Sequence, residues 1–295
     1  MPTRILHVSD LHFGRRDDAR ALESLGELAS RIAPELVVAS GDLTHRGTRA
    51  QHDTAAGFLR GLGLPLLAVP GNHDIPYTFP ARFTSPWAEF CRIWETTEPV
   101  HRSETAVVAG LNSVRPWRHQ SGRLTGAQLV HAAEVFAAAA PGALRVAVLH
   151  HHLLGAPWRS RKKPVAHRND VLAAFVESGA ELILAGHIHQ AAVAERREFE
   201  ISTPGGERAV VVSIAPGLRP AAAAPPRRGA RVPALRGGAA RTACPDLHLA
   251  GRRLGFDRST AVPARRRPPR FRAELEASKR RVESHQTLSP AEELS

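Results

Sequence analysis

Cysteine is almost absent from this chain of 295 residues, which contains only Cys91 and Cys244. Two cysteines exclude a disulfide framework and a metal site built from thiolates. Aromatic residues make up only 5% of the sequence, and no apolar run approaches the roughly 20 residues that a membrane-spanning helix needs. The amino-terminal segment also lacks the pattern of a signal peptide. We therefore expect a cytoplasmic protein without a membrane as partner.

Acidic residues are scarce in one part of the chain, and this scarcity accounts for the whole excess of positive charge. Residues 219–272 contain 14 arginines, no lysine and only two acids, whereas the whole chain has a net charge of +12. The remainder of the chain is therefore neutral. The isoelectric point of 11.2 thus says nothing about what the neutral part binds, and nucleic acid is expected as a partner only through the arginine-rich segment.

Three regions of the chain differ in composition. Residues 1–217 alternate apolar runs with helix-like stretches, as expected of a catalytic domain. Residues 218–270 have little apolar content and no periodicity, which favours disorder. Residues 271–295 form a tail, with a short helix predicted at 271–284. Two other interpretations of the arginine-rich part stay open: a flexible tether for nucleic acid or an acidic partner, and an out-of-frame translation of GC-rich DNA.

Short apolar runs rich in Leu and β-branched residues predict strands that are buried on both faces. These runs are residues 4–9, 36–40, 64–69, 106–111, 145–149 and 181–185. Helices are predicted between them at residues 17–32, 48–60, 84–95, 125–139 and 169–178. The alternation of strands and helices predicts an α/β layered fold.

Cap and turn residues give the boundaries of several elements. Thr125 is the expected N-cap of one helix, and Asn169 or Asp170 is the expected N-cap of another helix, which Gly179 ends. Residues 198–202 and 208–214 flank Pro204-Gly205-Gly206 and predict a hairpin. An antiparallel portion is therefore expected in addition to the parallel one.

Residues of metal-binding type follow these runs where each strand is predicted to end. They form the blocks Asp10-Leu11-His12, Gly41-Asp42, Gly71-Asn72-His73-Asp74, His150-His151-His152 and Gly186-His187-Ile188-His189. Each block alone has an ordinary explanation, such as a turn or a cap. The same residue types at successive strand ends predict one shared site. Asn112 follows a further run and is a weaker candidate.

The spacing within the blocks fits metal binding. Residues i and i+2 of an extended segment point to the same side. Asp10 and His12 are therefore expected to face one ion, and so are His187 and His189 if that turn is extended. Gly41 lets the backbone pass close to a crowded centre. Oxygen and imidazole ligands without sulfur favour Mn, Fe or Zn. So many ligands exceed one tetrahedral site and fit two adjacent ions.

In their order along the chain, the blocks resemble the calcineurin-like metallophosphoesterase superfamily. The strings HVSDLHFG, SGDLTHRG, VPGNHD and LAGHIH carry the resemblance, which covers residues 4–217 and is closest to the bacterial cyclic-nucleotide phosphodiesterase (class III) branch. The resemblance implies a four-layer αββα sandwich of two mixed β-sheets flanked by helices. It also places a dimetal site at the carboxyl-terminal ends of the strands.

The resemblance implies a role for each residue of the blocks. The first metal ion would be bound by Asp10, His12 and His189. The second would be bound by Asn72, His150 and His187, with His151 as the alternative to His150. Asp42 would bridge both ions. His73 would contact the phosphate and protonate the leaving oxygen, and Asp74 would orient His73.

These residues together predict a metal-dependent phosphohydrolase, a phosphodiesterase that acts on a cyclic nucleotide or another small phosphodiester. The ions would acidify a bound water, and the resulting hydroxide would attack phosphorus in line with the departing oxygen. His73 is a suitable general acid near neutral pH. Two alternatives are a DNA or RNA nuclease of the same superfamily and a non-catalytic interaction scaffold. The neutral catalytic part disfavours the first, and the complete ligand set disfavours the second.

Other residues near the blocks have two interpretations each. Asn112, Arg115 and His119 either reach the substrate or belong to a loop. His7 either supports the ligands or is a core histidine with a backbone partner, and His45 either lines the substrate cleft or lies in a solvated loop. Three tryptophans either stack on a base or pack under loops: Trp94, Trp117 and Trp158.

Overall fold

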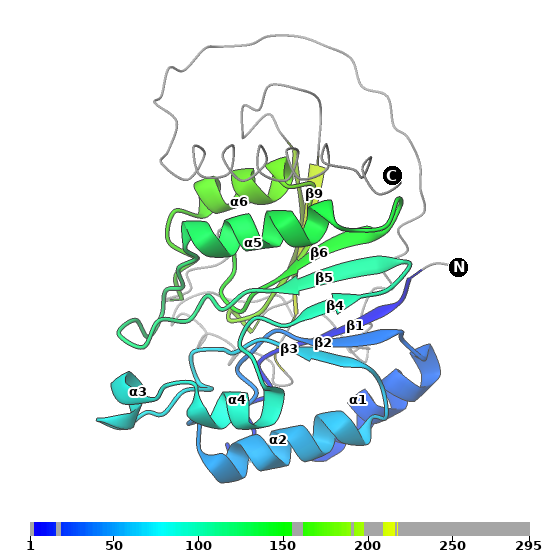
Figure 1. Cartoon of the computed structure of the whole chain (residues 1–295). Helices are drawn as coiled ribbons and strands as arrows, with labels where there is room; N and C mark the ends of the chain where they lie inside the picture. Colours follow the sequence, from blue (N-terminus) through cyan, green and yellow to red (C-terminus); the bar gives the residue numbers. More distant parts are fainter. Residues whose placement is uncertain are drawn as a thin grey trace, which may run out of the picture. The chain divides into compact units, whose positions relative to one another are not determined.

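Two β-sheets lie face to face between two layers of helices (Figure 1). The computed structural model describes residues 3–15, 19–154, 162–189, 192–197, 209–215 and 217. The smaller sheet has the order β1-β2-β3, with β1 (Ile5–Val8), β2 (Leu36–Ala39) and β3 (Leu66–Ala68). The larger sheet has the order β4-β5-β6-β7-β9-β8. Its strands are β4 (Val100–Arg102), β5 (Ala106–Gly110), β6 (Leu144–Val148), β7 (Leu182–Ala185), β8 (Ala192–Arg197) and β9 (Ala209–Ile214).

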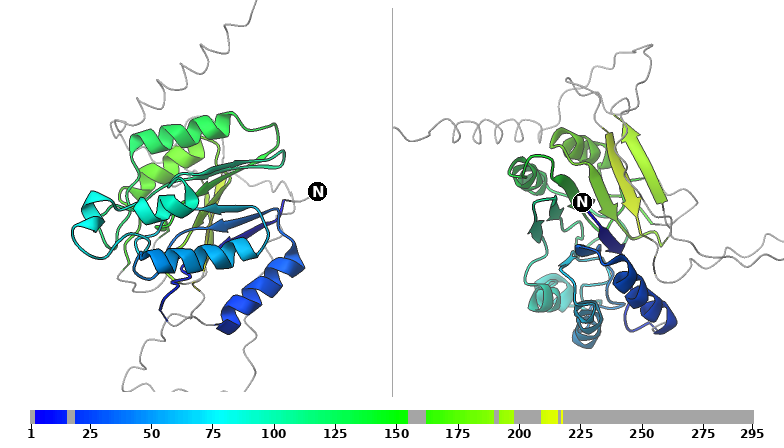
Figure 2. Two further views of the ribbon diagram at one scale, coloured as in Figure 1. Left: turned by 60° about the horizontal axis from the view of Figure 1, so that its bottom comes forward. Right: turned by 90° about the vertical axis from the view of Figure 1, so that its right-hand side faces the viewer.

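Helices cover the outer face of each sheet, as Figures 1 and 2 show. On the smaller sheet they are α1 (Ala19–Ile32), α2 (Arg49–Gly61) and α4 (Ala88–Trp94). On the larger sheet they are α5 (Gly126–Ala137) and α6 (Arg168–Glu177). The predicted four-layer α/β sandwich is therefore confirmed. Only the larger sheet is mixed, because the three described strands of the smaller sheet are all parallel.

Strand β2 shows why the predicted strands are apolar on both faces. Val37 and Ala39 belong to the cluster beneath the helices, together with Leu25 of α1. The side chains of Leu36 and Val38 point the opposite way and pack among residues of both sheets. Because neighbouring side chains of a strand alternate between its faces, a strand inside four layers needs an unbroken apolar run.

Several predicted boundaries agree with the structure. Thr125 caps α5 in a capping box with Gln128, as its position predicts. Gly179 has a φ of +82° and directly follows the C-cap Ser178 of α6. The N-cap of α6 is His167, with a φ of 56°, so the prediction of Asn169 or Asp170 is wrong.

Three other elements differ from the sequence prediction. The stretch 84–95 divides into α3 (Ala81–Thr84) and α4, because Pro86 disfavours helical backbone at Ser85, whose φ is −147°. Strand β4 was not predicted. In the hairpin, β9 lies where expected, but its antiparallel partner β8 begins at Ala192; residues 198–202 lie outside the described ranges.

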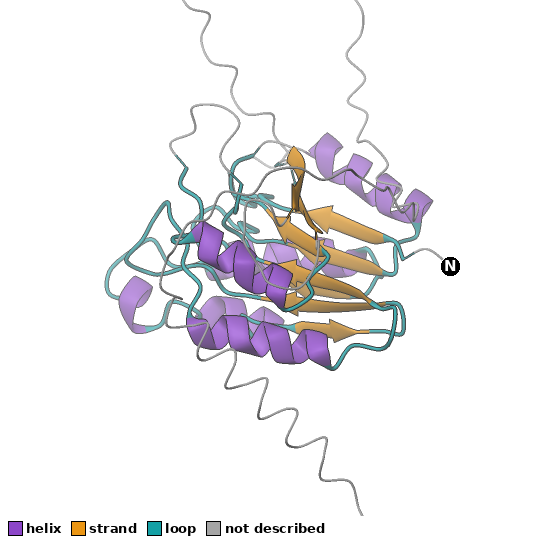
Figure 3. Cartoon of the chain, turned by 90° about the horizontal axis from the view of Figure 1, so that it is seen from above, coloured by secondary structure: helices purple, strands orange, loops and turns teal. Residues whose placement is uncertain are grey.

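The carboxyl ends of the parallel strands meet at one edge of the sandwich, because parallel strands point the same way. Figure 3 shows that loops gather at this end, away from the N-terminus. Within the described ranges, no helix is both long enough and apolar enough to cross a bilayer. The arginine-rich segment, the predicted helix at 271–284 and Trp158 lie outside the described residues.

Candidate metal centre

All five predicted blocks meet where β1, β2, β3, β6 and β7 end. Potential ligand atoms form three groups, each with its members within 4.8 Å of one another. One group is His12, His45 and His73. The other two groups share Asp42. Of these two, the first group is Asp10, His12, Asp42 and His189, and the second is Asp42, His150 and His187. The Asn72 Oδ1 atom joins the second group, since it lies 3.2 Å from His150 Nε2. The fold thus brings together every residue that the resemblance assigns to the metal ions.

Asp42 belongs to both the first and the second group, and its two carboxylate oxygens face different ones. Oδ1 lies 3.4 Å from His150 Nε2, and Oδ2 lies 3.7 Å from His12 Nε2. Oδ1 also accepts a hydrogen bond of 2.8 Å from the backbone N–H of His73. Oδ2 is buried and has no hydrogen-bond partner among the described residues. A carboxylate placed in this way is suited to bridging two cations.

One carboxylate oxygen of Asp10 is fixed by hydrogen bonds, and the other faces the ligand group. Oδ2 accepts hydrogen bonds of 2.8 Å each from the His187 N–H and the Ser9 hydroxyl. Oδ1 lies 3.0 Å from His189 Nε2 and has no hydrogen-bond partner in the described part of the chain. A buried carboxylate oxygen without such a partner is costly unless a cation compensates it. The donor set therefore fits a metal ion at this position.

The first histidine of the triplet has the geometry of a ligand. His150 Nδ1 lies 2.8 Å from the Ser40 carbonyl oxygen, so its Nδ1–H can donate there and leave Nε2 free for a metal. The Ser40 hydroxyl in turn lies 2.9 Å from His7 Nε2, which makes His7 a support for this arrangement. His151 instead places Nδ1 2.9 Å from the Ser113 hydroxyl, and it belongs to neither ligand group.

The backbone at the site is not extended, so the predicted geometry is wrong. Asp10 and His12 still lie in one group, but His187 and His189 lie in different groups and do not face one ion as predicted. The φ angles are 56° at Asp10, 51° at His12, 53° at Asp42, 77° at His187 and 58° at His189. Left-handed backbone costs of order 1–3 kcal/mol per residue outside glycine and clusters at functional sites. The surrounding structure imposes this conformation on five residues here, and they turn the side chains into the centre.

Two glycines let the loops after β2 and β3 touch. Gly41 has a φ of +89°, and a Cβ on it would lie 2.6 Å from the Gly71 nitrogen. A Cβ on Gly71 would collide with Asp42. The predicted role of Gly41 in close backbone approach is thus confirmed, with Gly71 as its counterpart.

The positive charge of His150 and the two negative charges of Asp10 and Asp42 stabilise each other. Burial alone would raise the pKa of Asp10, but the neighbouring His189, whose Nε2 lies 3.0 Å from Oδ1, and the charge of His150 outweigh burial and lower this pKa to about 2. Burial likewise opposes ionisation of Asp42, yet His150 holds the pKa of Asp42 well below its usual value. Against the effect of burial, Asp42 raises the pKa of His150 to about 9. The centre is therefore suited to cations.

Burial favours the neutral form of two other histidines, which is the form that binds metals. Burial lowers the pKa of His12 to about 4, although Asp42 and Asp10 oppose this change. Burial and the neighbouring His151 and His150 hold the pKa of His187 well below its usual value.

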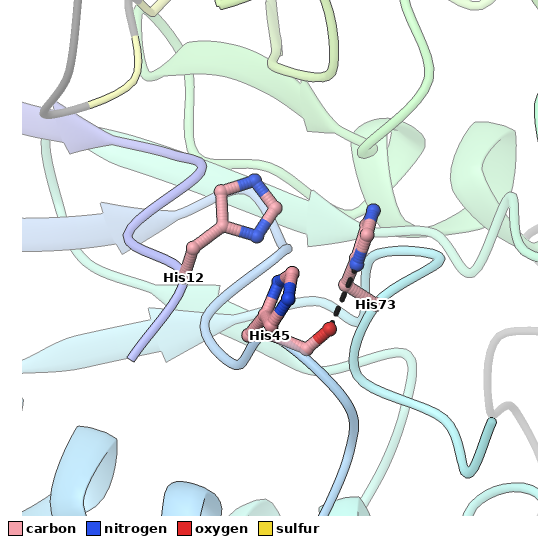
Figure 4. Close-up of side chains that lie close together, drawn as sticks. All are labelled: His12, His45 and His73. Atoms are coloured by element: carbon pink, nitrogen blue, oxygen red, sulfur yellow. Dashed lines mark hydrogen bonds between the residues drawn. The ribbon is translucent and has the colours of Figure 1, made fainter. Parts of the chain in front are cut away.

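Figure 4 shows His73 with His12 and His45. These three side chains are the third group of potential ligand atoms, and His73 belongs to neither of the groups that share Asp42. The His73 ring is perpendicular to that of His12, with centroids 4.8 Å apart. The His73 Nδ1 atom lies 2.9 Å from the His45 carbonyl oxygen and 3.2 Å from the Tyr77 hydroxyl. An Nδ1–H that donates to His45 leaves Nε2 as the other proton-carrying atom. His45 thus contributes to the site through its backbone.

Asp74 does not contact the ring of His73, contrary to expectation. Its carboxylate accepts hydrogen bonds of 2.8 Å from the Gly71 N–H, 2.8 Å from the Thr44 N–H and 3.2 Å from the Leu43 N–H. It therefore fastens the loops after β2 and β3 to each other. Among the described residues, the hydrogen-bond partners of the His73 ring are the His45 carbonyl oxygen and the Tyr77 hydroxyl. A direct orienting contact from Asp74 is therefore not observed.

Three weaker candidates, Asn112, Arg115 and Trp94, make contacts that support their own surroundings. Asn112 Oδ1 accepts a hydrogen bond from the Val114 N–H, and Arg115 donates to the Asn112 carbonyl oxygen and to Gln128 Oε1. Both residues thus stabilise their own loop. Trp94 packs against Phe90, with Arg60 over its ring.

Sequence reasoning missed Ser9, Tyr77 and Arg82 near the centre. Residues of these types carry no local signal, although Tyr77 lies only four positions after His73. Their roles depend on neighbours that are distant in the sequence.

The four-layer sandwich and the two groups of ligand-type residues that share Asp42 are the features of a dimetal phosphoesterase. The chain matches the family model of the calcineurin-like phosphoesterases over residues 3–191, and it belongs to that family. A probable cyclic nucleotide phosphodiesterase of Synechococcus sp. is 33% identical over 139 residues, which are 44% of this chain and 51% of that protein. The match therefore spans about half of that relative.

Two further comparisons extend this result. The DNA double-strand break repair protein Mre11 of Aeropyrum pernix is 36% identical over 87 residues, 25% of this chain and 21% of that protein. A dimetal phosphatase from Danio rerio shares the fold with a TM-score of 0.52 at 13% identity, covering 73% of this chain and 88% of that structure.

Proposed function

We propose that this chain is a metal-dependent phosphohydrolase, a phosphodiesterase that acts on a cyclic nucleotide or another small phosphodiester. The observation that carries the proposal is Asp42, whose two oxygens face two separate groups of ligand-type residues. Membership of the calcineurin-like family supports it. The relative named a probable cyclic nucleotide phosphodiesterase supports the choice of a diester.

Each of the two groups that share Asp42 is proposed to hold one ion of Mn, Fe or Zn. The first ion would be bound by Asp10, His12 and His189, and the second by Asn72, His150 and His187. Asp42 would bridge the two. When bound, such ions neutralise phosphoryl charge and acidify water.

The chain itself supplies a proton donor. His73 stands beside the first group and is a suitable general acid near neutral pH. Its Nδ1 faces the His45 carbonyl oxygen at 2.9 Å, so that Nε2 is the atom that would protonate the leaving oxygen. The backbone N–H of His73 is anchored on Asp42, which ties the position of the donor to the proposed bridge.

A nuclease is the second candidate, because a DNA repair protein is among the relatives. Residues 1–217 contain 23 basic and 21 acidic residues, a net charge of only +2, which disfavours binding to a polyanion through this part. An interaction scaffold is disfavoured because no proposed ligand is missing.

Hydrolysis assays on the purified full chain, reconstituted with Mn, test the proposal. We expect turnover of bis(4-nitrophenyl) phosphate and of cyclic nucleotides, which a chelator abolishes. Faster cleavage of single- or double-stranded DNA than of either small diester would favour the nuclease. No hydrolysis of any phosphoester with Mn, Fe or Zn would refute an enzyme.

A further inference from the structure

Exposed aromatic side chains gather in two loops next to the candidate metal centre. The described residues include five exposed large hydrophobic side chains, and four of them are Tyr77, Phe79, Phe83 and Trp117. Their exposed fractions are 44%, 83%, 53% and 69%. Single exposed hydrophobic residues are ordinary, but several large ones together indicate a binding surface. We name residues 76–83 and 116–119 the aromatic platform.

Arg82 fastens the two loops of the aromatic platform together. Its side chain is buried, and its guanidinium donates to the carbonyl oxygens of Pro116 at 2.8 Å and Pro76 at 3.1 Å. It also lies 3.3 Å from His119 Nδ1. A planar guanidinium with several fixed acceptors permits little movement. The aromatic side chains are therefore presented by a surface whose loops are already fixed to each other.

Tyr77 connects the platform to the proposed proton donor. Its hydroxyl lies 3.2 Å from His73 Nδ1, and the two ring centroids are 5.6 Å apart. On its other side, the Tyr77 ring lies 6.3 Å from that of His119, and the Arg82 guanidinium lies 5.9 Å from the Tyr77 centroid. Tyr77 thus places one end of the platform beside His73. Helix α3, which carries Arg82, lies beyond the strands on the side away from the N-terminus (Figure 1).

We propose that the aromatic platform binds the flat organic group on the leaving oxygen of the phosphoester. This inference rests on the proposed function, in which His73 protonates that oxygen. A group attached to this oxygen lies beside His73 and can extend toward Tyr77, where aromatic faces stack on an aryl ring or a nucleobase. The two loops contain no acidic residue, so they do not repel an anionic substrate.

Two substrates with leaving groups of similar acidity but different shape test the proposal. Ethyl phenyl phosphate releases an aromatic alcohol, and ethyl hexafluoroisopropyl phosphate releases a non-aromatic one; ³¹P NMR follows ethyl phosphate in both reactions. The variants are Trp117→Ala and Phe79→Ala. Both side chains are largely exposed, so their removal should leave folding intact. Val100→Ala is the matched control, since Val100 is exposed but lies outside both loops.

The expected result is a selective loss. In Trp117→Ala or Phe79→Ala, the ratio of kcat/KM for the aryl ester to that for the alkyl ester should fall about fivefold to tenfold, mainly through KM. This change corresponds to about 1 to 1.4 kcal/mol, the range of one aromatic pair. Trp117→Phe should recover most of the loss, and Val100→Ala should keep the wild-type ratio.

Three results would overturn the proposal. Equal losses for both esters would mean that the loops act on the centre and not on the organic group. Wild-type ratios in both alanine variants would show that no ring binds there. Self-association of the wild type, lost in the variants without a change in the ratio, would assign the surface to a second copy of the chain. Failure of the wild type to hydrolyse either ester contradicts the proposed function itself.

Discussion

Replacement of Asp42 by asparagine tests the bridging carboxylate directly. The Asp42→Asn change would keep the shape of the side chain and an oxygen that can accept from the His73 N–H, but it would remove one negative charge between the two groups. The Asp42 oxygens lie 3.4 Å from His150 Nε2 and 3.7 Å from His12 Nε2, so we expect a cation in either group within about 4 Å of this charge. At that distance one pair of unit charges is worth about 4 kcal/mol at an effective dielectric constant of about 20.

Since about 1.4 kcal/mol is a factor of ten, the loss should weaken metal binding by roughly 10³-fold. The measurement is the metal content per chain after dialysis, by mass spectrometry, together with turnover of bis(4-nitrophenyl) phosphate. We expect the Asp42→Asn variant to retain at most one ion and to lose turnover by a similar factor.

A matched control is Asp53→Asn, which removes an equal charge from the exposed pair with Arg92. This variant should keep both ions and its activity. Two retained ions in Asp42→Asn, with turnover within tenfold of the wild type, would refute the bridging role.

Three further predictions concern single residues. His73→Ala should keep the metal content and lower turnover by about 10²-fold or more, the scale of a lost general acid. Thr125→Ala should reduce the free energy of unfolding by about 1 kcal/mol, because the α5 cap is lost. Burial lowers the pKa of His7 from 6.5 to about 4, so the unfolded chain binds a proton more readily between these values. The free energy of unfolding of the metal-free protein should therefore fall as the pH drops from about 6.5 to 4, measured by denaturant titration, and His7→Gln should reduce this slope.

Each of these predictions has a distinct contrary outcome. Loss of metal from His73→Ala would make His73 a ligand. Thr54→Ala, within α2, is the comparison for the cap; an equal effect of both changes would mean that the Thr125 hydroxyl does not stabilise α5. An unchanged slope in His7→Gln would assign the acid sensitivity to other buried groups.

The strands and the metal-binding blocks were predictable from the sequence because their signals are local. An unbroken apolar run such as that of β2 predicts a strand buried on both faces, and this prediction does not require knowledge of the neighbouring strands. The blocks follow such runs, and parallel strands end at the same edge of a sheet. Asp10, Asp42 and His187 could therefore be predicted to lie at one edge. The capping box at Thr125 likewise needs only four consecutive residues.

Tertiary structure decided which atoms face each other. The triplet at 150–152 contains three identical side chains, and only Ser40 and Ser113, which are distant in the sequence, distinguish His150 from His151. The left-handed backbone at Asp10 could not be read from spacing, since the neighbouring loops impose it. The hydrogen bonds of Asp74 to the loops after β2 and β3 likewise depend on contacts that spacing along the chain does not show.

The sequence by itself therefore determined the class of fold and the residues that gather at the strand ends. Only the tertiary structure showed that the two oxygens of Asp42 face different groups. It also placed Tyr77 beside His73 and joined the loop of Tyr77 to that of Trp117 through Arg82. The physical reason is range: burial and periodicity act between near neighbours, whereas the direction of a carboxylate oxygen depends on contacts between segments that the sequence keeps far apart.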